Sequence, residues 1–297
     1  MKVFVTGATG FVGSAIVREL LQAGHQVTGL VRSAEDAESL TRAGAQAHIG
    51  NLNDLESLRS GAAASDGVIH TAFNHDFSQF KQNCENDRRI ITTFGEVLAG
   101  TERPLIVTSA LGLLPQGRLV TEQDTAVAGP NPRLASEEAA DVVASLGVRI
   151  SVVRLPPSVH GDGDHGFIPM LINVAREQGI SAFEGEGLNY WSAVHQLDAA
   201  RLYRLALEKA APGGTRYHAV GEEGIAFHYI AEAIGKGLGI PVVSKSKEED
   251  ALHFGWFAHF AAMDIRASGR QTQQELKWSP LQSGLIDDMK SGSYFSA

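Results

Sequence analysis

The sequence predicts an α/β fold in which a doubly wound parallel sheet is followed by a smaller, mostly helical lobe. Three observations support this prediction. Short apolar runs alternate with helical segments through the first half, a glycine-rich turn follows the first run directly, and the alternation breaks near residue 156. Strand–helix alternation at this spacing requires right-handed crossovers, which place helices on both faces of a parallel sheet.

Six apolar runs in the first 155 residues have the features of buried parallel strands, because they are rich in Val and Ile and several are apolar on both faces. The predicted strands cover residues 2–6, 26–31, 46–49, 67–72, 105–109 and 149–155. The helices predicted between them cover residues 12–23, 34–43, 55–60, 79–99 and 132–146. Gly24 and Gly147 stand where helix C-caps are expected, and Pro132 suits a first helical position.

The second half of the chain is predicted to build the smaller lobe, which covers the substrate. Prolines and glycines crowd into a loop at residues 156–166, and a helix is expected at 167–177. Residues 192–195 and 215–219 are predicted to return to the large sheet, with a helix at 198–208 between them. The first domain is therefore expected to hold residues 1–155 and 192–220, and the lobe residues 156–191 and 221–297.

Composition restricts the kinds of partner and the compartment. The 297-residue chain has 25 Lys and Arg against 34 Asp and Glu, a net charge of −9, so it is a poor binder of nucleic acid or anionic membranes. Its single cysteine, Cys84, allows no intrachain disulfide, so we expect a reducing, cytoplasmic location. No apolar run is long enough to span a bilayer, and glycines interrupt the N-terminus too early for a signal peptide.

The segment TGATGFVG is typical of a dinucleotide-binding loop, because it follows a predicted strand and opens a predicted helix. Gly7 permits the tight turn, Gly10 lets the backbone approach a pyrophosphate, and Gly13 lets the helix pack closely on the strand. Free N–H groups at the helix start then hold the anion. The residues of the loop that we expect at the cofactor are Gly7, Thr9, Gly10, Phe11, Val12 and Gly13.

The end of the second strand favours NADP over NAD. An NAD site usually places a carboxylate there for the ribose 2′-hydroxyl, but residues 29–33 (GLVRS) contain no acid. Arg32 can form a charge-assisted fork to a 2′-phosphate, and Ser33 can add a hydroxyl. The alternative is a solvated arginine at a strand end, with NAD as the cofactor.

The sequence resembles the extended short-chain dehydrogenase/reductases, also described as the NAD-dependent epimerase/dehydratase-like superfamily. The resemblance covers most of the chain and rests on TGATGFVG, HIGNLNDLESL (48–58), GVIHTA (67–72), IVTSALG (106–112), VVRLPPSVHGDGD (152–164) and WSAVHQLDAARLYRLALE (191–208). It implies a Rossmann-type fold with a nicotinamide cofactor across the carboxyl ends of the strands. The further cofactor contacts that it implies, from adenine to nicotinamide, are Asn51, Leu52, Thr71, Ala72, Phe73, Thr108, Pro156, Ser158 and Val159.

The chain departs from this family at the catalytic pair, a Tyr followed by a Lys four residues later on the same helix. Arg133 stands at the Tyr position and Glu137 at the Lys position, which is typical of an atypical subgroup. One interpretation is a simple Arg–Glu pair one helical turn apart. The other is an Arg133 that binds a substrate carboxylate or polarises a carbonyl. The family's serine matches Ser109, which would orient the substrate oxygen.

Hydride transfer to a carbonyl still needs a proton donor or a group that stabilises the oxyanion. His160 is the nearest candidate, because its loop leaves the sixth strand at the edge where ligands bind. The alternative is a histidine that is hydrogen-bonded within the loop. His165 and Tyr190 are weaker candidates. Residues 160–165 (HGDGDH) also carry metal-ligand types, but the resemblance accounts for this loop, so we predict no metal site.

The predicted function is that of an NADP-dependent oxidoreductase that transfers hydride to a small carbonyl, imine or activated alkene. Its catalytic residues would be Ser109, His160 and Arg133, and its partner a small molecule. Two alternatives stay open: a non-catalytic NADP-binding redox sensor, and a sugar-nucleotide epimerase or dehydratase. A homodimer would be ordinary for this family, and the sequence does not decide the oligomeric state.

Overall fold

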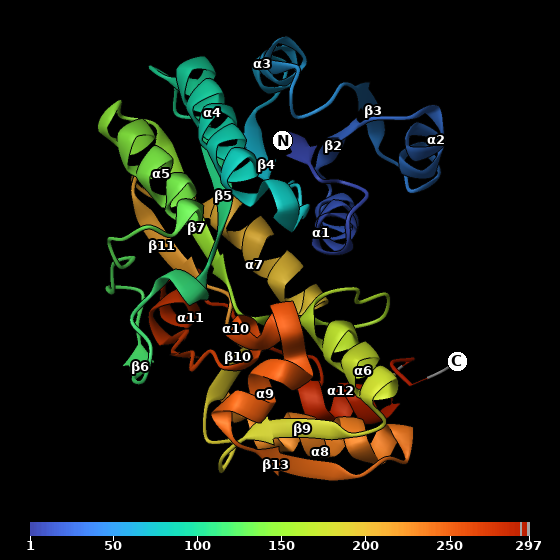
Figure 1. The fold of residues 1–297 in the computed structure, drawn as a ribbon. Coiled ribbons are helices and arrows are strands. Elements are labelled where there is room, and N and C mark those ends of the chain that lie inside the picture. Colours follow the sequence, from blue (N-terminus) through green and yellow to red (C-terminus); the bar gives the residue numbers. More distant parts are fainter. Residues whose placement is uncertain (292, 296–297) are drawn as a thin grey trace.

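The computed structural model describes residues 1–291 and 293–295. Its largest element is a parallel sheet of seven strands, which confirms the predicted fold class (Figure 1). In spatial order the strands are β11 (Thr215–His218), β7 (Arg149–Leu155), β5 (Pro104–Ala110), β4 (Gly67–His70), β1 (Lys2–Thr6), β2 (Gln26–Val31) and β3 (Gln46–Ile49). The chain order reverses between β1 and β4, so a topological switch point lies there, where open α/β sheets bind ligands.

Helices cover both faces of this sheet, and each face has its own apolar core. One core packs α1 (Phe11–Gln22), α2 (Ala34–Arg42) and α7 (Gln196–Lys209) on the sheet. The other packs α3 (Leu55–Ala63), α4 (Phe80–Leu98) and α5 (Ala135–Ser145) on the opposite face. The inner strands β1, β4, β5 and β7 are therefore buried along most of their length, which explains their largely apolar sequence, whereas the edge strand β3 stays partly exposed. We call the sheet and these helices the Rossmann part.

The remaining elements form a second part, the small lobe, which lies below the Rossmann part in Figure 1. It contains three small sheets: β12 (Glu222–Ala226), β10 (Tyr190–His195) and β8 (Ser158–His160); β13 (Val242–Lys245) with β9 (Ser181–Glu184); and β14 (Arg266–Ala267) with β6 (Leu119–Val120). Its helices are α6 (Phe167–Gln178), α8 (Phe227–Leu238), α9 (Lys247–Phe254), α10 (Ala258–Ala261), α11 (Arg270–Leu276) and α12 (Leu285–Ser291). The core of the lobe gathers around the fully buried Trp191.

Four short 3₁₀ turns complete the described elements: η1 (Phe77–Gln79), η2 (Leu111–Leu113), η3 (Pro132–Leu134) and η4 (Gly255–Phe257). The predicted single helix at 132–146 is therefore wrong in its first turn, because η3 precedes α5. Asn131 caps this turn by accepting a hydrogen bond from the Arg133 N–H. None of the described helices is both long and apolar enough to cross a membrane.

One strand prediction for the second half is confirmed and one is wrong. β11 pairs in parallel with β7 and extends the large sheet, as predicted for residues 215–219. Residues 192–195 do not return to that sheet, because β10 pairs with β8 and β12 in the small lobe. β10 is buried along most of its length, and a buried strand has the same apolar pattern in either sheet.

Candidate active site

The glycine-rich loop between β1 and α1 has the geometry of an anion cradle. A Cβ added at Gly13 would lie 1.9 Å from the Gly7 carbonyl oxygen, and one at Gly7 (φ +71°) would lie 2.8 Å from Thr71 Oγ1. Gly10 begins α1 without a side-chain cap, and the first turn contains no acidic residue. The first N–H groups of α1 are therefore left for a ligand, and the loop fits a dinucleotide pyrophosphate. Thr9, Phe11 and Val12 lie in this loop and the first turn of α1.

At the end of β2, the two residues predicted to bind a 2′-phosphate differ in whether their side chains are already hydrogen-bonded. Arg32 is exposed. Ser33 caps α2, since its Oγ accepts from the Asp36 N–H at 3.1 Å and donates to Asp36 Oδ2 at 2.9 Å. The Ser33 hydroxyl is thus committed to its own helix. At the end of β3, Asn51 likewise uses its side-chain oxygen locally, to accept from the Asn53 N–H, while Leu52 is half-buried.

Behind the switch point, a chain of hydrogen bonds joins β1, β4 and α4. Thr6 Oγ1 lies 2.6 Å from His70 Nδ1, and His70 Nε2 lies 2.9 Å from Asp87 Oδ1. All three side chains are buried. Thr71 Oγ1 donates to the Thr6 carbonyl at 2.8 Å, so the start of the segment after β4 is fixed to β1. Thr108 on β5 is also occupied, because its Oγ1 bonds the His70 carbonyl and the Tyr203 hydroxyl.

The same chain ends at Arg133. Its Nη1 lies 2.9 Å from Asp87 Oδ2, and its Nη2 donates to the Thr108 carbonyl at 3.2 Å. Ser136 Oγ bonds both Arg133 and Asp87. The guanidinium carbon also lies 4.4 Å above the centre of the Phe73 ring. With five N–H donors and a side chain that remains 14% exposed, Arg133 keeps donors for a further oxygen.

The interpretation of Arg133 and Glu137 as a pair is wrong, because the two side chains leave the helix in different directions. Glu137 is 4% exposed and accepts from Arg154 Nε at 2.9 Å and from Arg216 Nε at 3.2 Å. Burial alone would raise the pKa of Glu137, but the hydrogen bonds and charges of the two arginines lower it below its usual value. Glu137 therefore holds α5 on β7 and β11 and does not join Arg133.

Ser109 lies near Glu137 and Arg154, and not near Arg133. It pairs in register with Arg154 on β7 and is 2% exposed. Its hydroxyl lies beside the Glu137 carboxylate, where it helps to lower the pKa of Glu137, although it forms no hydrogen bond of regular geometry there. The Ser109 hydroxyl therefore lies beside the buried Glu137 carboxylate and not beside Arg133 in the described structure.

The loop after β7 is tied to the C-terminal end of the chain. His160 is 1% exposed, and its Nδ1 lies 2.8 Å from Asp288 Oδ2 on α12. The histidine is hydrogen-bonded as the alternative interpretation proposed, although its partner lies outside the loop. Pro156 and Ser158 are buried and Val159 is half-buried. The buried Ser158 hydroxyl has no hydrogen-bond partner among residues 1–291 and 293–295.

No group of three His, Cys, Asp or Glu side chains within the described residues could hold a metal ion. The residues of HGDGDH are used separately: His160 bonds Asp288, Asp164 accepts from the Gly166 N–H, and His165 bonds the Gly163 carbonyl.

His75 is a candidate that the sequence reasoning missed. It follows β4 in the segment HTAFNH and is exposed, and its ring contacts Phe73 at a centroid distance of 5.3 Å. Desolvation by the neighbouring side chains, followed by the charges of Arg133 and His165, lowers the pKa of His75 below its usual value although the residue is exposed on the whole. His165 in turn contacts Phe11 of the glycine-rich loop at 5.7 Å. No spacing in the sequence indicates that these residues meet, because they come from four separate segments.

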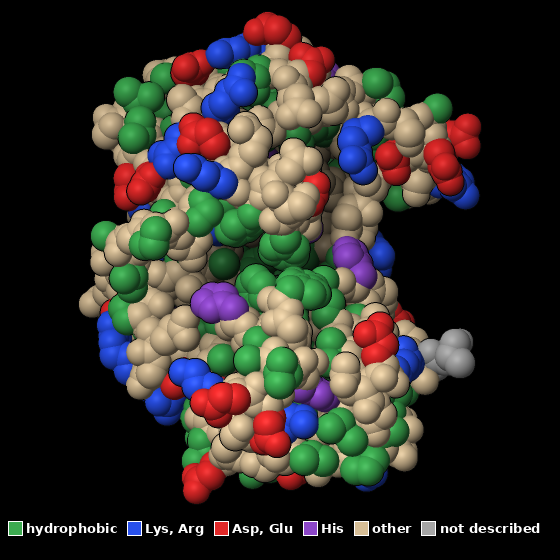
Figure 2. All heavy atoms as spheres, viewed as in Figure 1, with side chains coloured by type: hydrophobic (Ala, Val, Ile, Leu, Met, Phe, Trp, Pro, Cys, Tyr) green, Lys and Arg blue, Asp and Glu red, His purple; other side chains and the backbone are tan. Residues whose placement is uncertain are grey.

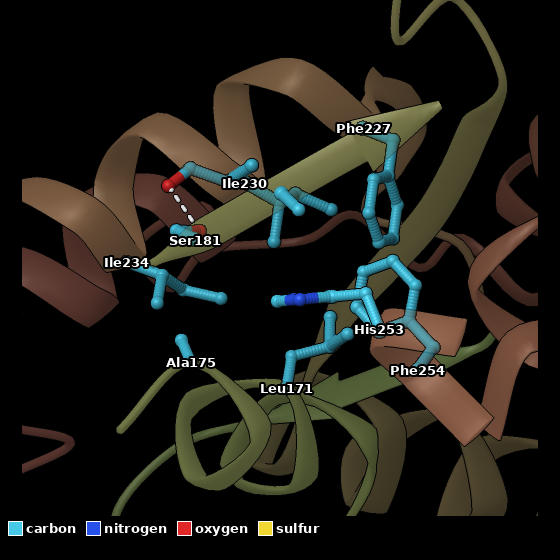
Figure 3. A pocket seen from close by; sticks show the side chains of 10 residues that line it. Leu171, Ala175, Ser181, Phe227, Ile230, Ile234, His253 and Phe254 are labelled. Carbon is cyan, nitrogen blue, oxygen red and sulfur yellow. Dashed lines mark hydrogen bonds between the residues drawn. The ribbon is translucent and has the colours of Figure 1, made fainter. Parts of the chain in front are cut away.

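Two cavities lie inside the small lobe, and neither is lined by the large sheet. One has about 410 Å³ and is lined by residues of β9, α8, α9 and α10. The other has about 10 Å³, the room of a single water, between apolar side chains of α6 and α8 (Figure 3). His253 points into it, and its Nε2 has no partner within the described residues. These cavities are separate from the cofactor cradle.

A family model described as NAD(P)H-binding matches residues 7–167. An uncharacterized protein of Schizosaccharomyces pombe is 53% identical over 296 residues, which cover 99% of this chain and 100% of that protein. The 4-hydroxy-2-methyl-3-oxo-4-farnesyl-3,4-dihydroquinoline-1-oxide ketoreductase of Stigmatella aurantiaca is 29% identical over 229 residues, 73% of this chain and 67% of that enzyme. The crystal structure of DesIV, a dTDP-glucose 4,6-dehydratase of Streptomyces venezuelae with NAD bound, shares the fold with a TM-score of 0.76 at 19% identity, covering 98% and 96% of the two chains. The chain belongs to the NAD(P)H-binding family.

Proposed function

We propose that the chain is an NADPH-dependent reductase of carbonyl compounds in which Arg133 takes the place of the family's tyrosine. The observation that carries the proposal is the position of its guanidinium. Asp87 and the Thr108 carbonyl hold it at the carboxyl edge of the sheet, and the side chain stays partly exposed. A fixed cation with spare N–H donors is suited to bind the oxygen on which negative charge develops.

The cofactor contacts follow from the residues that remain free. The loop from Gly7 to Gly13 would hold the pyrophosphate, and Arg32 would bind the 2′-phosphate without help from Ser33. The buried, unpaired Ser158 hydroxyl would bond the carboxamide of the nicotinamide. When bound, NADPH supplies the hydride.

We assign the proton to His75 and not to His160. His75 is exposed and shares the Phe73 ring with Arg133, whereas His160 is enclosed with Asp288. Arg133 stays charged and stabilises the alkoxide. The His75 imidazolium gives its proton to that oxygen and is reprotonated from water. Because the pKa of His75 lies below 6.5, kcat should decline as pH rises through that pKa.

Turnover of NADPH with a panel of aldehydes and ketones tests this function. Replacing Arg133 with Met should lower kcat about 10²–10³-fold, the usual loss for one oxyanion donor, and leave the Kd for NADPH unchanged. His75→Gln should remove the decline of kcat with rising pH. Tight NADPH binding without turnover of any carbonyl would instead support the binding-only alternative, and interconversion of sugar nucleotides would support the epimerase alternative.

The preference for NADP is tested by Arg32→Ala. Loss of a charge-assisted contact to the 2′-phosphate should weaken NADPH binding about 10–100-fold and leave NADH binding unchanged. Arg42→Ala, at the exposed end of α2, is the matched control and should change neither affinity. Equal losses for both cofactors, or none, would contradict the assignment of Arg32.

A further inference from the structure

A path of aromatic rings leads away from Arg133 along the segment that follows β4. The Phe73 ring lies under the guanidinium and contacts the Phe80 ring at a centroid distance of 6.2 Å. Phe80 contacts Phe77 of η1 at 5.8 Å. This segment of eight residues thus carries three rings, more than a loop needs to cover the start of α4. All three, Phe73, Phe77 and Phe80, are only half-buried.

Phe77 connects this segment to the small lobe. Its ring lies 5.8 Å from Trp256 of η4 and 5.8 Å from Phe260 of α10. Phe260 in turn contacts Phe167 at the start of α6, at 4.9 Å. The rings therefore bridge the Rossmann part and the small lobe beside Arg133. We call Phe77, Trp256 and Phe260 the aromatic bridge.

The aromatic bridge is not a closed core. Trp256 remains 64% exposed although it contacts two further rings, Phe257 and Phe260. Figure 2 shows hydrophobic side chains gathered in the hollow between the two parts, with histidines at its borders. This surface combines exposed aromatic side chains with the nearby Arg133 guanidinium. It therefore fits a ligand that has an apolar part and an oxygen atom that can accept a hydrogen bond.

Resting on the function proposed above, we propose that the substrate is an amphipathic carbonyl compound with a flat aromatic or otherwise apolar body. Its carbonyl oxygen lies at Arg133, and its body stacks on the aromatic bridge. Offset and edge-to-face ring contacts of this kind favour flat π-systems over saturated polar ones. The three side chains offer a sugar nucleotide one hydrogen-bonding group, the Trp256 indole N–H, for its many hydroxyl and phosphate oxygens, so the same wall disfavours it.

The proposal predicts a steep preference within a matched series at saturating NADPH. Phenylglyoxal should be reduced with a kcat/KM about fivefold or more above that of methylglyoxal, which has the same dicarbonyl group and no ring, since one ring contact contributes about 1 kcal/mol. Phe77→Ala and Trp256→Ala should raise the KM for phenylglyoxal and leave both the KM for methylglyoxal and the Kd for NADPH unchanged. Leu252→Ala, another exposed apolar side chain of the small lobe, is the control and should change none of these values.

Trp256 fluorescence gives a binding readout that is independent of turnover. The other two tryptophans, Trp191 and Trp278, are buried at 0% and 2% exposure, so quenching by an unreactive aromatic analogue such as benzyl alcohol reports on Trp256 and should vanish in Trp256→Phe. Quenching without any turnover would uphold the aromatic bridge and reject the reductase. Equal kcat/KM for the ring and ringless substrates, or no quenching, would overturn the inference.

Discussion

Asp87 decides what Arg133 can do. It is 4% exposed and receives hydrogen bonds from His70, Arg133 and Ser136. Burial alone would raise the pKa of Asp87, but the His70 hydrogen bond and the Arg133 charge lower it below its usual value, so the carboxylate stays ionised. A buried carboxylate with these partners fixes the guanidinium at one place, where a surface arginine would sample many rotamers.

Asp87→Asn tests this positioning role. Asparagine keeps the volume but removes the charge that holds Arg133. We expect the free energy of unfolding to fall by about 3–5 kcal/mol, as when one partner of a buried ion pair is lost. A displaced guanidinium should also lower kcat about 10²-fold, with the Kd for NADPH unchanged.

Glu138→Gln is the matched control for Asp87→Asn, because Glu138 pairs with Arg88 on the surface. It should change the stability by less than about 1 kcal/mol and leave kcat unchanged. A loss of stability in Asp87→Asn without any loss of kcat would mean that the ion pair is only structural.

At the scale of elements, the turn of η3 before α5 separates two residues that a continuous helix would have brought to one face. Restoring the family's lysine by Glu137→Lys should therefore fail. The new cation would face Arg154 and Arg216 in a buried position, so we expect a loss of more than about 3–5 kcal/mol in the free energy of unfolding. Glu137→Gln, which keeps hydrogen-bond acceptance, should lose less. A stable Glu137→Lys variant in chemical denaturation would show that this register is wrong.

The parallel sheet could be predicted from the sequence because each β–α unit carries its own local signal. The apolar runs that became β1 to β5 and β7, and the glycines of the α1 loop, need only their neighbours to be recognised. The directions of the Arg133 and Glu137 side chains could not be predicted. They depend on the ion-pair partners Asp87 and Arg154, which lie on other elements. The hydrogen-bond partner of His160 could not be predicted either, because Asp288 is 128 residues away in the sequence.

The loop before α1 yields a prediction of its own. Gly13→Ala would place a Cβ 1.9 Å from the Gly7 carbonyl oxygen, which is backbone and has no rotamer to escape into. The helix must move away from β1, so NADPH binding should fall below detection in a calorimetric titration, together with a loss of stability. Gly129→Ala is the control, because nothing lies within 4 Å of its added Cβ. Unchanged NADPH binding in Gly13→Ala would exclude this loop as the phosphate cradle.

At the scale of the whole molecule, a segment far away in the sequence holds the loop at residues 156–166, which we call the wall. This loop follows β7, and α12 and Tyr294 are hydrogen-bonded to it. Tyr294 bonds it twice, since its hydroxyl accepts from the Gly161 N–H at 3.1 Å and donates to Asp164 Oδ2 at 2.9 Å. The last described residues thereby help to hold the wall that carries Ser158.

Removing these bonds should loosen the wall without unfolding the protein. Asp288→Asn removes the charge beside His160, and Tyr294→Phe removes both hydrogen bonds of the Tyr294 hydroxyl, so each should lower the stability by about 0.5–1.5 kcal/mol. Amide hydrogen exchange should become faster in residues 158–166, while the strands of the large sheet keep their protection, because the loop opens locally before the core does. The exposed neighbour Asp287, which pairs only with Lys290, provides the control in Asp287→Asn. Unchanged exchange in both variants would mean that the loop holds its conformation alone, and faster exchange across the whole sheet would mean that the C-terminal segment stabilises the entire fold.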